Sequence, residues 1–177
     1  MDSVESGLHH WMAHTPGVDA GDDRAVAAEA ARQRIGRLSR AFSSLLDEIA
    51  EASGITTADW AALSVIARSP NGHTTPGELG SALHLTSGTV STRLRRLVDA
   101  GLVEVLPTDD RRSRPVHLTP SGHKQWSEAT QARIGSERDL FDALDDDDLR
   151  SLNRILRDLL APLEDRYGPA PAHDRVG

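Results

Sequence analysis

Six arginines lie in a short middle segment of this 177-residue chain, and arginine side chains bind phosphates and the edge of guanine. They are Arg93, Arg95, Arg96, Arg111, Arg112 and Arg114. Residues 86–114 carry a net charge of +2, whereas the whole chain carries −7 and the remainder therefore −9. A basic segment in an acidic body predicts a local surface that attracts a polyanion.

Small hydroxyl residues precede the first of these arginines at helical spacing. Thr86 is a candidate N-cap for a helix that ends near Ala100, and Gly101 suits the position after it. One face of this helix is apolar and should anchor it; it consists of Val90, Leu94, Leu97 and Val98. Hydroxyls followed by arginines on the other face suit a helix that enters a major groove, and a merely solvated face is the alternative.

A second short helix and a charged hairpin flank this helix. Residues 75–78 read Thr-Pro-Gly-Glu, a capping box that predicts a helix over 76–83, so the two helices have a helix-turn-helix outline. Two β-like runs follow, residues 102–106 and 115–118, and they enclose a loop with three arginines. Arginines at a loop tip repel one another, so a phosphate backbone or a minor groove explains them better than stability does. The alternative is that this loop is a solvated turn.

Helical patterns flank this central segment on both sides. Apolar spacing predicts helices over residues 22–52, 57–69, 120–144 and 146–165, and acidic residues 145–148 suit the start of the last one. Val4, Leu8, Trp11 and Met12 form one stripe, so residues 1–20 are an extension that is either a short helix or a frayed tail. We expect residues 168–177 to be disordered.

Several classes of protein are excluded by what the sequence lacks. The chain has no cysteine, which excludes disulfides, thiolate metal sites and thiol catalysis. No glycine-rich phosphate loop or nucleophile elbow is present, so we do not expect an enzyme or a cofactor. His10 and His14 are four residues apart, but a zinc site needs a third ligand, and no metal site is predicted. Without a long apolar run or a secretory signal, we expect a cytoplasmic protein.

The order of these elements resembles the MarR family of bacterial winged helix-turn-helix regulators over about residues 34–163. The resemblance is carried by residues 85–103 and by the wing, Asp110-Arg111-Arg112-Ser113, with residues 116–122 after it. It implies a mainly α fold with a small β-hairpin wing. Within a domain over residues 21–167, residues 57–118 would form the winged helix-turn-helix DNA-binding lobe. Residues 22–52, 120–144 and 146–165 would form the helical dimerisation lobe of a homodimer.

The resemblance also implies which residues contact double-stranded DNA. On the recognition helix, residues 86–100, we expect contacts from Thr86, Ser87, Thr89, Thr92, Arg93, Arg95 and Arg96. In the wing, Arg112 would reach the minor groove and Asp110 would orient it. Arg111 and Arg114 would bind phosphates. The two-fold symmetry of a dimer predicts an inverted-repeat operator.

A regulatory role with a small-molecule effector follows from the same resemblance. It implies an anionic or aromatic ligand that releases the protein from DNA. We expect a repressor of its own or a neighbouring gene, because nothing in the sequence resembles a polymerase-contacting domain. Trp11 and Arg93 match positions of a urate-binding subset, whereas Ala61 and Val105 replace the aspartate and the arginine expected there. Trp11 as a simple packing anchor is the alternative. A winged-helix module that binds a protein partner instead of DNA is the alternative function.

Overall fold

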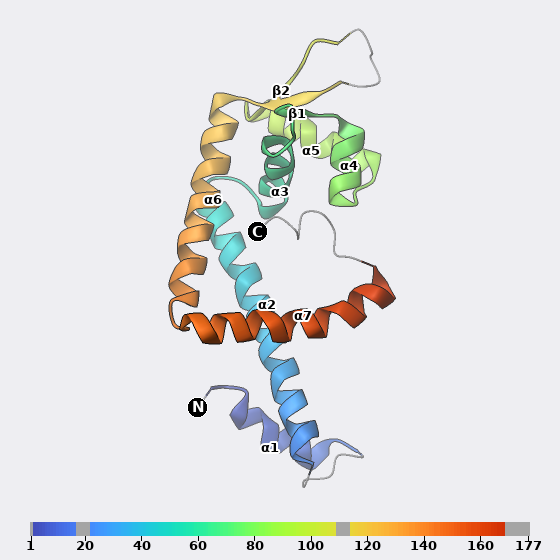
Figure 1. Cartoon of the computed structure of the whole chain (residues 1–177). Helices are drawn as coiled ribbons and strands as arrows, with labels where there is room; N and C mark the ends of the chain where they lie inside the picture. The colour runs from blue at the N-terminus through green and yellow to red at the C-terminus, as the bar shows by residue number, and fades with distance from the viewer. Residues whose placement is uncertain (1, 17–21, 109–113, 169–177) are drawn as a thin grey trace. The chain divides into compact units, whose positions relative to one another are not determined.

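The computed structural model describes residues 2–16, 22–108 and 114–168, and the chain divides into two compact units, residues 1–48 and 49–177 (Figure 1). Its helices are α1 (Glu5–His14), α2 (Asp23–Ala52), α3 (Thr57–Ala67), α4 (Pro76–Leu83), α5 (Ser87–Asp99), α6 (Pro120–Phe141) and α7 (Asp146–Tyr167). Its strands are β1 (His73–Thr74), β2 (Val103–Val105) and β3 (Val116–Leu118). The mainly helical winged fold predicted from the sequence is confirmed. None of the described helices is long and apolar enough to cross a membrane.

The first unit joins α1 to the first part of α2. Val4 and Leu8 are buried with Ala30 in a small apolar cluster. Arg34 donates from Nε to Asp2 Oδ2 at 2.7 Å, and this hydrogen bond lowers the pKa of Asp2 to about 2. Residues 5–14 are therefore a helix tied to α2 by apolar contact and by charge, and not a frayed tail.

The centre of the second unit is α3, a helix that is apolar on nearly every side. Leu63 and Ile66 have no exposed surface, and α3 packs against α4, α6, β1 and β3. Two tryptophans join it to α6: Trp60 donates to Thr130 Oγ1 at 3.2 Å, and Trp126 donates to Ser64 Oγ at 3.1 Å. A helix buried all round fixes the positions of everything that packs on it.

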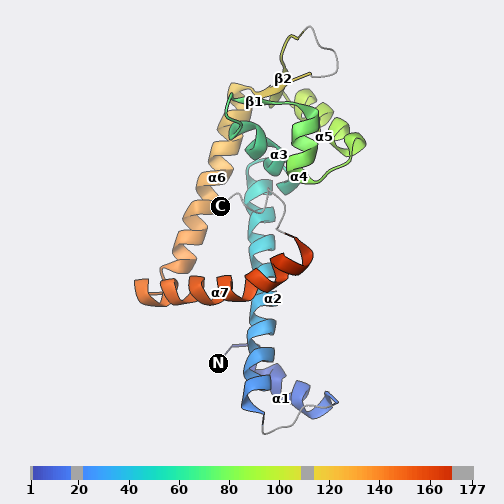
Figure 2. The same cartoon turned by 45° about the vertical axis from the view of Figure 1, so that its right-hand side comes forward.

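The strands form a three-stranded antiparallel sheet in the order β1-β3-β2. The central strand β3 pairs His117 with His73 on one side and with Glu104 on the other. Figure 2 shows this sheet beside α4 and α5. The hairpin of β2 and β3 was expected from the sequence, whereas β1 was not, because two residues are too short to show alternation.

The start of α6 fits tightly against the end of the helix-turn-helix segment. Thr119 caps α6 by accepting a hydrogen bond from Gly122 N at 3.0 Å, and its hydroxyl donates to Gly101 O at 2.7 Å. Gly122 packs directly on the backbone of Leu102, and a Cβ at this glycine would overlap the Leu102 carbonyl oxygen. The beginning of α6 is thereby fixed to the root of the hairpin.

Some helix boundaries differ from the prediction. The helix predicted over residues 120–144 ends at Phe141, because residues 142–145 form the turn that leads to the Asp145 N-cap of α7. The helix predicted over residues 57–69 ends at Ala67, and α7 runs to Tyr167 rather than to residue 165. The predicted disorder of residues 168–177 falls, after residue 168, outside the described residues.

The contact at Gly122 predicts opposite effects for two glycine-to-alanine changes in α6. Gly122→Ala should lower the free energy of unfolding by about 3 kcal/mol or more, since the backbone of Leu102 must move. Gly135→Ala, where a Cβ meets nothing within 4 Å, should raise it by about 0.5–1 kcal/mol through helix propensity. Urea unfolding of both variants checks the pair, and equal stabilities would contradict it.

Candidate nucleic-acid interface

The helix α5, which the sequence predicts to be the recognition helix, is held by a polar cap and an apolar underside. Thr86 is its N-cap and accepts a hydrogen bond from Thr89 N at 3.4 Å. Val90, Leu94 and Leu97 are buried, as the sequence predicted, and α5 packs against α4 and β2. Val98 was assigned to the same anchoring face, but it is 38% exposed and lies beside Arg95 in a surface groove. The anchor is therefore narrower than predicted, which leaves more of α5 at the surface.

One flank of α5 carries five of the seven DNA-contacting residues that were predicted on this helix. A shallow groove of about 570 Å³ is lined by Thr86, Gly88, Thr89, Thr92, Arg93 and Arg96. All of these residues are exposed except Arg93, which is half-buried. Hydroxyls stand at the N-terminal end of this flank and arginines at the C-terminal end, an arrangement that offers hydrogen bonds to base edges and charge to phosphates.

The other flank brings the helix and the root of the wing together. A groove of about 390 Å³ is lined by Pro76, Ser91, Leu94, Arg95, Val98, Val105, Arg114 and Val116. Arg95 from α5 and Arg114 from the wing line the same groove although they are far apart in sequence. Arg114 has φ of 35°, a left-handed conformation that is uncommon for a residue with a side chain. One arginine of α5 and one of the wing therefore line the same groove, whose other residues are mostly apolar.

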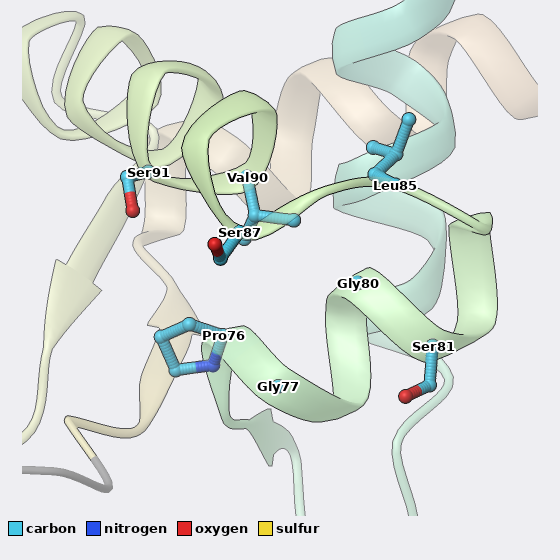
Figure 3. Close-up of a pocket in the computed structure, with 8 residues that line it drawn as sticks. All are labelled: Pro76, Gly77, Gly80, Ser81, Leu85, Ser87, Val90 and Ser91. Carbon is cyan, nitrogen blue, oxygen red and sulfur yellow. The ribbon is translucent and has the colours of Figure 1, made fainter.

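The space between α4 and α5 is small and lined by small residues. Figure 3 shows Pro76 on α4 and Ser87 and Val90 on α5 around a pocket of about 310 Å³. Gly80 allows the two helices to approach, since a Cβ there would lie 3.3 Å from both Leu85 O and Val90 Cγ2. Thr75 and Glu78 complete the predicted capping box at the start of α4, and these hydrogen bonds lower the pKa of Glu78. Both helices of the motif are thus fixed at their N-termini.

Arg96 makes a contact that the sequence analysis did not predict. Its guanidinium forms an ion pair with Asp59 of α3 and lies 3.4 Å from Thr56 Oγ1. Thr56 and Asp59 form a capping box at the start of α3, a Thr-x-x-Asp signal that is visible in the sequence. The signal locates the start of the helix, but it does not reveal a partner 37 residues away.

The remaining predicted residues fall into separate places. Asp110, Arg111 and Arg112, the tip of the wing, lie outside the described residues. Trp11 is half-buried on α1 in the first unit, and Arg93 belongs to the second unit. His10 and His14 stack with ring centroids 4.1 Å apart, and no group of three metal-ligating side chains occurs among the residues described here.

Comparisons with known proteins give a consistent result. A family model described as the MarR family matches residues 53–113. An uncharacterized HTH-type transcriptional regulator of Bacillus subtilis, YdgG, is 32% identical over 87 residues, which cover 48% of this chain and 57% of that protein. The chain spans about half the length of the curated relatives it matches.

Solved structures extend the similarity over more of the chain. The reduced form of MarR from E. coli is 30% identical with a TM-score of 0.59, and the match covers 72% of this chain and 94% of that one. A mutant of the same MarR in complex with operator DNA is 29% identical with a TM-score of 0.57, covering 72% of this chain and 91% of the other. Almost three quarters of the chain, 72%, therefore matches each of these two structures.

Proposed function

The chain belongs to the MarR family of transcriptional regulators, and on that premise we propose that it is a homodimeric repressor that binds an inverted-repeat operator and is released by a small-molecule ligand. The family consists of regulators and not of enzymes. The observation that carries the proposal is the exposed face of α5, where hydroxyls and arginines stand over a buried apolar underside. A relative of similar fold was solved on operator DNA, which supports the same partner here. A DNA partner also supports a cytoplasmic location.

On this proposal, α5 lies in the major groove and the wing lies over the neighbouring minor groove. The hydroxyls of Thr86, Ser87, Thr89 and Thr92 and the guanidinium groups of Arg93 and Arg95 face base edges and phosphates. Arg114 and Arg111 bind the backbone beside them. Arg112, oriented by Asp110, enters the minor groove. The guanidinium of Arg96 is already bound by Asp59.

The homodimer is supported by the apolar face of α7. None of the residues Asp146–Tyr167 is buried, yet one face of the helix carries large apolar side chains that are 42–72% exposed. They are Ile155, Leu156, Leu159, Leu160, Leu163 and Tyr167. A continuous apolar stripe of this size is characteristic of a protein interface. A second copy of the chain would cover it and would place two α5 helices on one DNA duplex.

The proposal includes a small-molecule effector. Trp11 and Arg93 are the candidate ligand-binding residues, and an anionic or aromatic molecule is the class of ligand that their chemistry suits. A ligand that binds better to the DNA-incompetent conformation would shift the dimer toward that state and release the operator.

The DNA-binding proposal predicts a specific pattern of variants. Arg95→Gln should weaken binding to a labelled duplex from the upstream region by about tenfold and reduce the magnitude of the salt slope by about 0.9, as loss of one arginine–DNA contact does. Arg112→Ala should weaken binding comparably and leave the dimer intact. The measurement is fluorescence anisotropy with random DNA as competitor.

The matched control is Arg150→Gln, which removes the same charge from an exposed arginine paired with Asp147 on α7. It should change the affinity by less than about twofold. Equal losses of DNA affinity for Arg95→Gln and Arg150→Gln would mean that the loss arises from net charge and not from a contact of Arg95 with DNA. A wild-type chain that binds no DNA at low salt would favour the protein-partner module.

The dimer proposal predicts that one charge on the apolar face of α7 separates the protomers. Leu159→Glu should convert the dimer to a monomer, because a carboxylate in an apolar interface must be desolvated. Ala161→Glu adds the same charge to the opposite face of α7 and should leave the dimer unchanged. Sedimentation equilibrium distinguishes the two, and a Leu159→Glu variant that remains dimeric would contradict the assignment of this face.

A further inference from the structure

Arg96 is an exposed arginine whose charged end is bound to a buried carboxylate. The Arg96 side chain is 56% exposed, whereas the Asp59 side chain is only 8% exposed. The guanidinium Nη2 donates to Asp59 Oδ1 and also lies 3.4 Å from Thr56 Oγ1. Arg96 therefore lines the shallow groove on α5, while its guanidinium contacts residues at the start of α3.

The other oxygen of the same carboxylate belongs to the cap of α3. Asp59 Oδ2 accepts from Thr56 Oγ1 at 2.7 Å and from Thr56 N at 3.3 Å, and Thr56 Oγ1 accepts from Asp59 N at 3.1 Å. Arg96 supplies the positive charge that a buried carboxylate requires. Withdrawing the guanidinium to reach a phosphate would leave Asp59 buried without its counter-charge.

This ion pair directly joins two helices that otherwise share α4 as a packing partner. The helix α5 packs on α4 and β2, whereas α3 packs on α4, α6, β1 and β3. We propose that Arg96 is a positioning residue, which fixes α5 to the N-terminus of α3 through Asp59 and sets its orientation toward DNA, and that it is not a DNA contact. The inference rests on the proposed DNA-binding function.

The alternative is that Arg96 binds DNA and that Asp59 merely competes with phosphate for it. The two accounts give opposite signs for Asp59→Asn. If Asp59 competes, removal of its charge frees Arg96, and binding becomes tighter. If the pair positions α5, the same change weakens binding, although it removes a negative charge near the DNA-binding face.

The test is a double-mutant cycle in DNA affinity, with the upstream duplex described above as probe. Asp59→Asn and Arg96→Gln should each weaken binding by roughly tenfold, and the double variant should be no weaker than the single ones, since all three break the same pair. The salt slope should stay at its wild-type value in all of them. Asp99→Asn is the matched control: it removes an exposed carboxylate at the end of α5 and should not weaken binding.

Tighter binding by Asp59→Asn would overturn the inference, and so would a salt slope that falls by about 0.9 in Arg96→Gln. If Asp59→Asn fails to fold, the salt slope of Arg96→Gln decides alone, because this exposed side chain is removed without opening the core.

A second cycle, in urea unfolding without DNA, separates failure of this inference from failure of the proposed function. Unfolding free energies of the four proteins should be non-additive if the pair forms in solution. Additive values would refute the pair and leave the proposed function intact. A wild type that binds no DNA would refute the proposed function, whatever the unfolding cycle shows.

Discussion

The burial of α3 is the constraint on which the second unit depends. Leu63 and Ile66 lie at its centre. Trp60 of α3 and Trp126 of α6 each donate a hydrogen bond to the other helix. Because α3 is covered by helices and by the sheet, it can hold α4 and the wing in one arrangement. The helix α5 packs on α4 and β2, so its position depends on this arrangement. Its apolar underside is small, so its orientation depends on the elements around it as much as on its own core residues.

Hydrogen bonds and ion pairs of polar groups add to the packing of the apolar core. A side-chain oxygen of the N-cap residue caps the start of α3, α4, α5, α6 and α7. These residues are Thr56, Thr75, Thr86, Thr119 and Asp145. At the start of α3, Asp59 takes part in the cap with Thr56 and also accepts a hydrogen bond from Arg96. The residues that begin α3 therefore also contact α5. The exposed charges are also unevenly distributed over the chain. The chain is acidic overall, yet Arg93, Arg95 and Arg114 lie on or beside the face of α5, where attraction to phosphate acts at short range.

Local signals in the sequence predicted local structure well. The capping box of Thr75 and Glu78, the Thr86 cap and the positive φ of Gly101 depend on residues a few positions apart, and all three are observed. Contacts between distant segments were not predictable in this way. The pairing of β1 with β3 and the ion pair of Arg96 with Asp59 arise only when the chain is folded. Val98 illustrates the same limit, since helical spacing places it on the apolar face but does not show how far neighbouring elements extend over that face.

In the proposed complex, two copies of the chain present their α5 helices to one DNA duplex. Hydroxyl-radical footprinting of the wild-type protein on its upstream region measures this arrangement. We expect two protected segments related by a two-fold axis, with centres about 10 base pairs, or one helical turn, apart. A single protected segment without symmetry, or no protection at protein concentrations that saturate the duplex, would contradict it.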